Sequence, residues 1–193
     1  MQKRYCFYIF LLFFCFFAMA KTQHFKISGT NSGYGVVVKF NEQMYLAAPS
    51  HILFGSIAPH AEYNGQSYSI STYYLSNLRD FALLELENKT LLPTLSYITI
   101  GESTLAPCEK NFYFDFDITN SSLKNTTNYR GLSGTLINTS KQLGLFQGYK
   151  INRLNQKKIF KAITLTVFPN ELQKVDFEKI RAEFLQKNLK NSK

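Results

Sequence analysis

Short β-prone segments separated by turn residues fill most of this 193-residue chain. The apolar segments 36–40 and 44–48 flank an Asn-Glu pair, a pattern that predicts a β-hairpin. No long helical pattern lies between one strand-like segment and the next, which argues against a parallel α/β sheet and predicts an all-β fold. Further strands are expected within 67–74, 78–86, 95–100, 110–117, 136–137, 144–150 and 160–167.

After Pro169 the apolar period changes from that of a strand to that of a helix. Leu172, Val175, Ile180 and later apolar residues fall near one face at helical spacing, and Asn170 is a suitable N-cap. The sequence therefore predicts a C-terminal amphipathic α-helix that ends near residue 189. The last fifteen residues contain five basic side chains and one acidic side chain, so they form a basic tail.

The first twenty residues have the three parts of a secretory signal peptide. A basic start is followed by an apolar run over 5–17 and by Ala18-Met19-Ala20. The apolar stretch is shorter than the roughly 20 residues that span a bilayer, which favours cleavage over a membrane anchor. We expect cleavage after Ala20 and a secreted or periplasmic mature protein.

Composition limits the chemistry that the mature chain can use. Cys108 is the only cysteine after residue 20, so an intrachain disulfide is excluded. His24, His51 and His60 are scattered and form no metal-binding motif, so neither a metal nor another cofactor is expected. The net charge of +9 is concentrated toward the tail, where it could favour an anionic surface, and no nucleic-acid partner is expected.

Three polar residues stand in settings that suit nucleophilic catalysis. Ser133 lies in Gly131-Leu132-Ser133-Gly134, a pattern that can present a hydroxyl on a tight turn before a strand. His51 follows small residues that leave room for an imidazole, and Asp80 opens a half-buried strand. A carboxylate in that position can hold a histidine ring while the ring takes a proton.

Taken in order, these motifs resemble those of the trypsin-like, chymotrypsin-fold serine peptidases, nearest to the disulfide-free bacterial branch. The resemblance extends over residues 27–168. The matching stretches are Ser32-Gly33-Tyr34-Gly35-Val36-Val37, Leu46-Ala47-Ala48-Pro49-Ser50-His51-Ile52-Leu53, Asp80-Phe81-Ala82-Leu83-Leu84 and Gly131-Leu132-Ser133-Gly134.

The resemblance implies a specific architecture. It implies an all-β fold of two packed six-stranded antiparallel β-barrels followed by a C-terminal α-helix. The N-terminal barrel would occupy 21–104 and carry His51 and Asp80, and the C-terminal barrel would occupy 105–168 and carry Ser133. Residues 169–193 would form the terminal helix and the basic tail.

The resemblance also implies a role for each candidate residue in peptide-bond hydrolysis. Ser133 would be the nucleophile, His51 its general base and acid, and Asp80 the group that orients His51. The N–H groups of Gly131 and Ser133 would form the oxyanion hole. Phe146, Gln147 and Gly148 would lie along a substrate peptide bound as an added strand.

A second function remains open from the sequence alone. Leu132, Thr135 and Leu136 depart from the family pattern around the nucleophile, and Ser50 stands where the family usually has Ala. These departures favour the alternative of a peptidase fold kept as a protein- or peptide-binding module. Basic, apolar and acidic substrate specificities all remain open, as does the oligomeric state.

Overall fold

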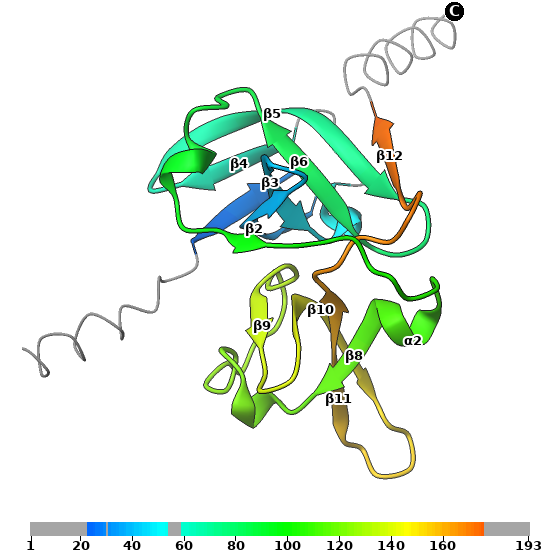
Figure 1. Cartoon of the computed structure of the whole chain (residues 1–193). Helices are drawn as coiled ribbons and strands as arrows, with labels where there is room; N and C mark the ends of the chain where they lie inside the picture. Colours follow the sequence, from blue (N-terminus) through cyan, green and yellow to red (C-terminus); the bar gives the residue numbers. More distant parts are fainter. Residues whose placement is uncertain (1–22, 30, 54–58, 176–193) are drawn as a thin grey trace, which may run out of the picture.

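The computed structural model describes residues 23–29, 31–53 and 59–175 and has a predominantly β architecture. Figure 1 shows a strand-rich part that contains β2 to β6 above a second part that contains β8 to β11. The all-β class predicted from the sequence is confirmed. The predicted signal peptide, 1–20, and the predicted basic tail lie outside the described residues.

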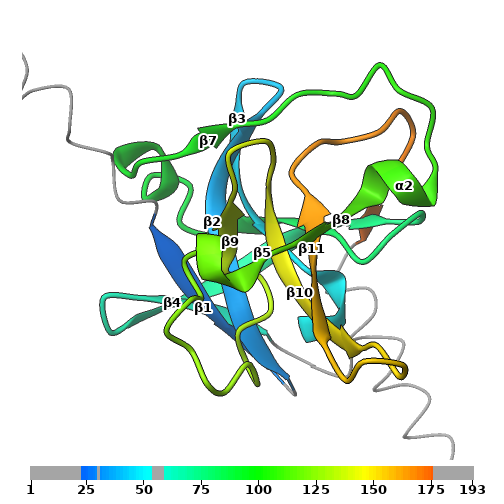
Figure 2. The same cartoon turned by 90° about the horizontal axis from the view of Figure 1, so that it is seen from below.

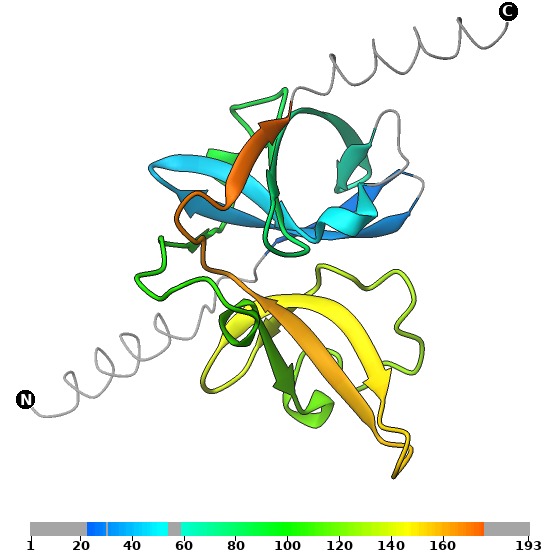
Figure 3. The same cartoon turned by 90° about the vertical axis from the view of Figure 1, so that its right-hand side faces the viewer.

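The first part is a closed antiparallel barrel of six strands. Each strand pairs with the next in the order β1–β2–β3–β6–β5–β4, and β4 returns to β1. Figure 3 shows this part as a ring of strands. The six strands are β1 (His24–Ser28), β2 (Ser32–Phe40), β3 (Gln43–Ala48), β4 (His60–Tyr63), β5 (Gln66–Ser76) and β6 (Ala82–Leu86).

Continuous apolar runs form the strands that are buried on both faces. In β2, Val37 points into the barrel core, whereas Val36 and Val38 pack in a second core. That second core also contains Leu145 and Ile163 from the lower part. Successive residues of a strand point to opposite faces, so an unbroken valine run satisfies both cores at once.

The second part is a curled sheet of four strands in the order β8–β11–β10–β9. Figure 2 looks through these strands toward the barrel. The strands are β8 (Tyr113–Phe116), β9 (Leu136–Asn138), β10 (Leu143–Ile151) and β11 (Lys158–Thr164). A register shift between Phe146 and Gly148 leaves Gln147 as a bulge in β10, and such bulges bend a strand.

The second sheet is a half-barrel, which corrects the expectation of a second six-stranded barrel. Between β8 and β9 the chain forms only the short helix η3 (Ile118–Asn120) and a series of turns. This segment is rich in Asn, Ser and Thr, whose side chains bond to nearby backbone and compete with strand pairing. Asp117, for example, accepts hydrogen bonds from both the N–H and the hydroxyl of Thr119.

Two elements differ from their sequence predictions. Where a helix was expected to begin, Leu172–Val175 forms β12, which pairs with β5. The exposed edge of β5 supplies backbone partners there, and this pairing overrides the helical spacing. The rest of that predicted helix lies outside the described residues. The strand predicted over 110–117 instead begins as the short helix α2 (Glu109–Phe112).

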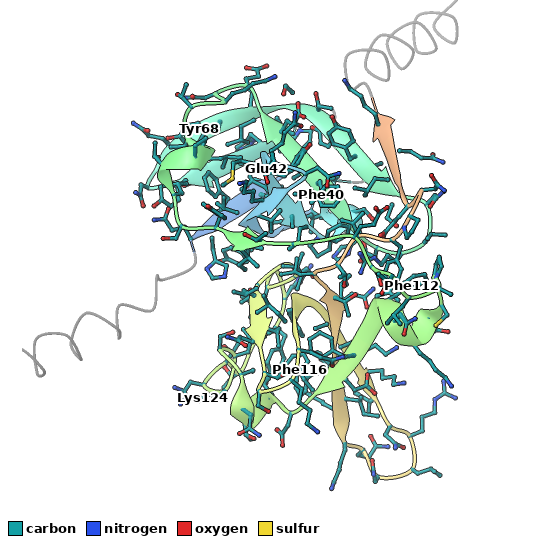
Figure 4. All side chains as sticks on the ribbon, in the orientation of Figure 1. Phe40, Glu42, Tyr68, Phe112, Phe116 and Lys124 are labelled. Carbon is teal, nitrogen blue, oxygen red and sulfur yellow. The ribbon has the colours of Figure 1, made fainter. Side chains whose placement is uncertain are left out.

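The remaining elements lie in the connections between strands. The short helices η1 (Ser50–Ile52) and η2 (Leu92–Thr94) follow β3 and β6, and β7 (Ile98–Thr99) pairs parallel to β2. In Figure 4, Phe112 lies on α2 where that helix leads into β8, and Phe116 lies within the second sheet. No helix in the described ranges is long and apolar enough to span a membrane.

Candidate active site

The turn that carries Ser133 depends on glycine at two positions. Gly131 and Gly134 have φ values of +76° and +88°, a region that residues with a side chain rarely adopt. A Cβ atom on Gly134 would lie 1.7 Å from the carbonyl oxygen of Tyr34. Thr135 closes the turn, because its N–H and its hydroxyl both donate to the carbonyl of Leu132, at 3.0 and 2.8 Å.

This nucleophile turn, residues 131–135, is docked between the barrel and β10. On the barrel side, the N–H of Tyr34 donates to the carbonyl of Ser133 at 2.7 Å. On the other side, the N–H of Gly134 donates to the carbonyl of Phe146, also at 2.7 Å. The glycine-rich stretch at the start of β2 therefore fixes the backbone of the residue that carries the candidate nucleophile.

His51 and Asp80 form the hydrogen-bonded pair expected from the sequence. Nδ1 of His51 lies 2.6 Å from Oδ2 of Asp80. The other carboxylate oxygen accepts the backbone N–H of His51 at 2.8 Å and the hydroxyl of Ser50 at 2.9 Å. Both Ser50 and His51 belong to η1, so one short helical turn supplies three contacts to the carboxylate.

These contacts shift the pKa values of both side chains. The hydrogen bond with Asp80 raises the pKa of His51 above 6.5, and the charge of the carboxylate adds to this, although partial burial acts in the opposite direction. Burial favours the neutral form of Asp80, but the bonds from His51 and Ser50 outweigh it and hold the pKa of the carboxyl below 3.8. The pair therefore favours ionised Asp80 and stabilises a proton on His51.

His51, Gly131 and Ser133 line one surface cavity of about 480 Å³. The hydroxyl of Ser133 donates to the carbonyl of Gln147 at 3.3 Å. Among the hydrogen bonds of the described residues, none joins Ser133 directly to His51. Gln147 contacts both sides of the site, since its side-chain amide also donates to Oδ2 of Asp80 at 3.4 Å.

Two backbone N–H groups beside the nucleophile are available to a ligand. Within the described ranges, no protein acceptor bonds to the N–H of Gly131 or to that of Ser133. Both residues are half-buried and line the cavity that contains His51. Such donors can stabilise negative charge on an oxygen that enters the cavity.

The three residues predicted to contact substrate differ in whether their backbone groups are free to pair with a peptide. Phe146 uses both backbone groups within the protein, because its N–H donates to Thr135 and its carbonyl accepts from Gly134. β9 pairs with β10 only as far as Leu145. From Gln147 onward, this edge of β10 has no strand partner in the described part of the chain. The part of β10 whose edge is open to an added peptide strand thus begins at Gln147 and includes Gly148.

Sequence reasoning overlooked a buried ion pair next to Asp80. The side chains of Arg79 and Glu171 are both completely buried, and Nε of Arg79 donates to Glu171 at 2.6 Å. Arg79 also donates to Thr164 and to the carbonyl of Thr166. Its guanidinium lies 4.5 Å from the ring centroid of Phe81. In the sequence, Glu171 simply follows the expected N-cap Asn170, and no local pattern marks Arg79 as buried.

The described residues contain no group of three or more His, Cys, Asp or Glu side chains that could hold a metal ion. The chemical groups that the site presents are the hydroxyl of Ser133, the imidazole of His51, the carboxylate of Asp80 and the neighbouring N–H groups.

Comparison with protein families gives no match, and comparison with curated proteins gives none either. Among solved structures, the chain is similar to the NSP4 proteinase from Equine Arteritis Virus, with a TM-score of 0.35 and 10% sequence identity. The similarity covers 77% of this chain and 65% of that proteinase.

Proposed function

We propose that this chain is a serine endopeptidase that hydrolyses peptide bonds through a covalent intermediate on Ser133. The observation that carries the proposal is the placement of His51. Its Nδ1 is bonded to Asp80, and the residue lines the same cavity as Ser133. A nucleophile, a base and a group that orients the base are the three parts that this chemistry needs.

In the proposed reaction, the hydroxyl oxygen of Ser133 attacks the substrate carbonyl carbon while Nε2 of His51 takes the hydroxyl proton. The C–N bond then breaks, and His51 returns the proton to the departing amine. Water next attacks the resulting ester, again through His51, which releases the acid and restores Ser133. Asp80 stays ionised and stabilises the positive charge that His51 carries between these transfers.

The free N–H groups of Gly131 and Ser133 support the same proposal. The carbonyl oxygen becomes negatively charged when Ser133 attacks, and these donors would bind it. Each such donor contributes about 3 kcal/mol to stabilising the transition state in enzymes of this kind. The residues that bond the nucleophile turn to β2 and β10 keep the donors in place before substrate binds.

The proposal is tested by replacing Ser133 with Ala in the purified protein and measuring hydrolysis of an unfolded protein such as casein. Removing one member of a catalytic triad lowers turnover by several powers of ten. We expect that loss, with an unchanged circular dichroism spectrum. Undiminished hydrolysis by the Ser133→Ala protein would contradict the proposal.

We also propose that the mature enzyme is exported after cleavage at Ala20. The basic start, apolar run and Ala-x-Ala ending support this. N-terminal sequencing of protein recovered outside the cytoplasm should begin at Lys21. Recovery of the uncleaved chain only from inside cells would contradict export.

A peptide-binding module is the second candidate function. The hydroxyl of Ser133 bonds to Gln147 rather than to His51, and the family pattern is altered at Leu132 and Thr135. The open edge of β10 could bind an extended peptide without cleaving it. Peptide binding that survives Ser133→Ala, together with absence of Ser133-dependent hydrolysis, would favour this candidate.

A further inference from the structure

A second pocket of about 380 Å³ adjoins the cavity of Ser133. Residues 127–130, residues 146–149 and Lys158 line it. Arg130 lines both hollows, and Gln147, whose carbonyl accepts the hydroxyl of Ser133, lines this pocket. The pocket is therefore next to the place where Ser133 would attack a substrate carbonyl.

The charged residues of this pocket are all cationic. Arg130 and Lys158 line it, and no carboxylate does. Across the described residues, neither cation takes part in a salt bridge. Their charges are therefore not neutralised by the protein. A carboxylate that entered the pocket would meet unpaired positive charge, whereas a lysine or arginine side chain would be repelled.

Aromatic rings hold the ammonium group of Lys158 in position. Its Nζ lies 4.8 Å from the ring centroid of Tyr149 and 5.1 Å from that of Tyr129. Both rings pack against the buried Phe160, at centroid distances of 5.8 and 5.1 Å. A cation over ring faces is attracted to them and keeps its N–H donors for another partner. The pocket therefore has aromatic side chains with an exposed ammonium group beside them.

We propose that this pocket binds an acidic side chain, glutamate or aspartate, at the substrate residue whose carbonyl Ser133 attacks. This inference rests on the proposed function and specifies the class of substrate. Charge-assisted hydrogen bonds from Lys158 and Arg130 would replace the water that the carboxylate loses on entry. The neutral amide of glutamine has nearly the same shape but lacks the charge, so charge decides the preference.

The experiment compares four peptides that differ only at that residue, which is Glu, Gln, Leu or Lys. For the purified protein we expect kcat/KM to be at least about tenfold higher for the Glu peptide than for the Gln peptide. Replacing Lys158 with Met should reduce this Glu-to-Gln ratio about tenfold. The matched control is Lys157→Met, because Lys157 is an adjacent lysine that is exposed like Lys158 but does not line the pocket. The control should keep the ratio of the unchanged protein.

The possible outcomes separate this inference from the proposed function. Cleavage that depends on Ser133 but prefers Gln, Leu or Lys would overturn the acidic specificity and leave the peptidase intact. A ratio unaffected by Lys158→Met would overturn it as well. If no peptide is cleaved in a manner that depends on Ser133, the proposed function and the inference both fail.

Discussion

Several residues of the candidate site form hydrogen bonds to Asp80. Its carboxylate accepts hydrogen bonds from the Ser50 hydroxyl, the His51 backbone and the Gln147 amide, and it binds the His51 ring. Its own N–H donates to the hydroxyl of Tyr113, at 3.3 Å. A carboxylate held from this many directions fixes the orientation of the imidazole, which is what a general base requires.

The raised pKa of His51 predicts the pH dependence of activity. His51 must be neutral to accept the proton of Ser133, so kcat/KM should rise with pH through the pKa of His51. Because the bond to Asp80 raises that pKa, the midpoint should lie above 6.5. The contribution of His51 to folding has the opposite pH dependence, since it is lost as pH rises through the raised pKa of His51. The contribution of Asp80 is lost at the acidic end, as pH falls through its lowered pKa.

Replacing Asp80 with Asn checks the cause of that shift. The variant lacks the charge and the acceptor that hold the proton on His51, so the midpoint should fall, and kcat should drop by about 10⁴. The measurement is kcat/KM against pH for both proteins. A midpoint below 6.5 in the unchanged protein, or the same midpoint in Asp80→Asn, would contradict this account.

At the residue scale, the sequence identified His51 and Asp80 as partners, but it did not identify the other groups that bond to Asp80. His51 and Asp80 stood out because each follows or opens an apolar strand, and the structure joins them. Ser50 was noted only as a departure, yet it donates to Asp80. Gln147 was expected to contact substrate, and its bonds to Ser133 and Asp80 depend on a β-bulge that leaves no mark in the residue pattern.

At the scale of elements, the contact between the nucleophile turn and β2 fixes the position of the Ser133 backbone. Gly33 and Gly134 permit this contact, because a Cβ on Gly33 would lie 2.7 Å from the carbonyl oxygen of Ser133. Two glycine-containing motifs, about a hundred residues apart in sequence, therefore contribute to the same contact. Because glycine has no side chain, the two backbones can approach each other closely at both positions.

We predict that Gly134→Ala disrupts this contact. The new methyl group would overlap the backbone of Tyr34, and alanine is strained at a φ of +88°. The melting temperature should fall, and the rate of reaction of Ser133 with an active-site probe should fall by at least about tenfold, since small misplacements of reacting groups are costly. Gly101→Ala is the control, because open space surrounds that position. Equal probe reaction rates in the two variants would contradict the role assigned to the turn.

Element types were predictable where the apolar pattern was long and unambiguous, as in β2, β3 and β10. The prediction was wrong at Leu172–Val175, where residues at helical spacing form β12 on the edge of β5. Helical spacing does not outweigh a pairing edge that the fold provides at the start of this segment. The second six-stranded barrel was also wrong, because the polar segment between β8 and β9 satisfies its backbone in turns.

In the whole molecule, Arg79 joins the barrel to the end of the second sheet, and Glu171 supplies its counter-charge. Arg79 lies in the loop between β5 and β6, whereas its partners Thr164 and Thr166 lie at and after the end of β11. The adjacent residue is Asp80. The bonds from Arg79 to Thr164 therefore connect the half of the molecule that carries His51 to the half that carries Ser133, and Glu171 holds the guanidinium in place.

Replacing Glu171 with Gln should destabilise the protein by about 3–5 kcal/mol, because it leaves a completely buried guanidinium without its counter-charge. The measurement is the free energy of unfolding in urea. The control is Glu87→Gln, since Glu87 is exposed and should tolerate the change within about 0.5 kcal/mol. A loss of less than about 1 kcal/mol in Glu171→Gln would contradict the importance of the pair.

The all-β architecture could be predicted from the order of short strands in the sequence. The contacts that connect the two halves of the molecule could not. A buried ion pair joins residues 92 positions apart, and its members look like ordinary turn residues in the sequence. The cationic pocket could not be predicted from the sequence either. Arg130 and Lys158 come from separate segments that only the folded chain brings together.

The central claim is that Ser133 is a nucleophile activated by His51. Its most direct test is mass spectrometry of the purified protein after treatment with a fluorophosphonate, which reacts with activated serines and requires no assumption about substrate. We predict a single adduct on Ser133 that is lost in a folded His51→Ala protein. A folded, unchanged protein that forms no adduct on Ser133, or one whose adduct persists without His51, would contradict the claim.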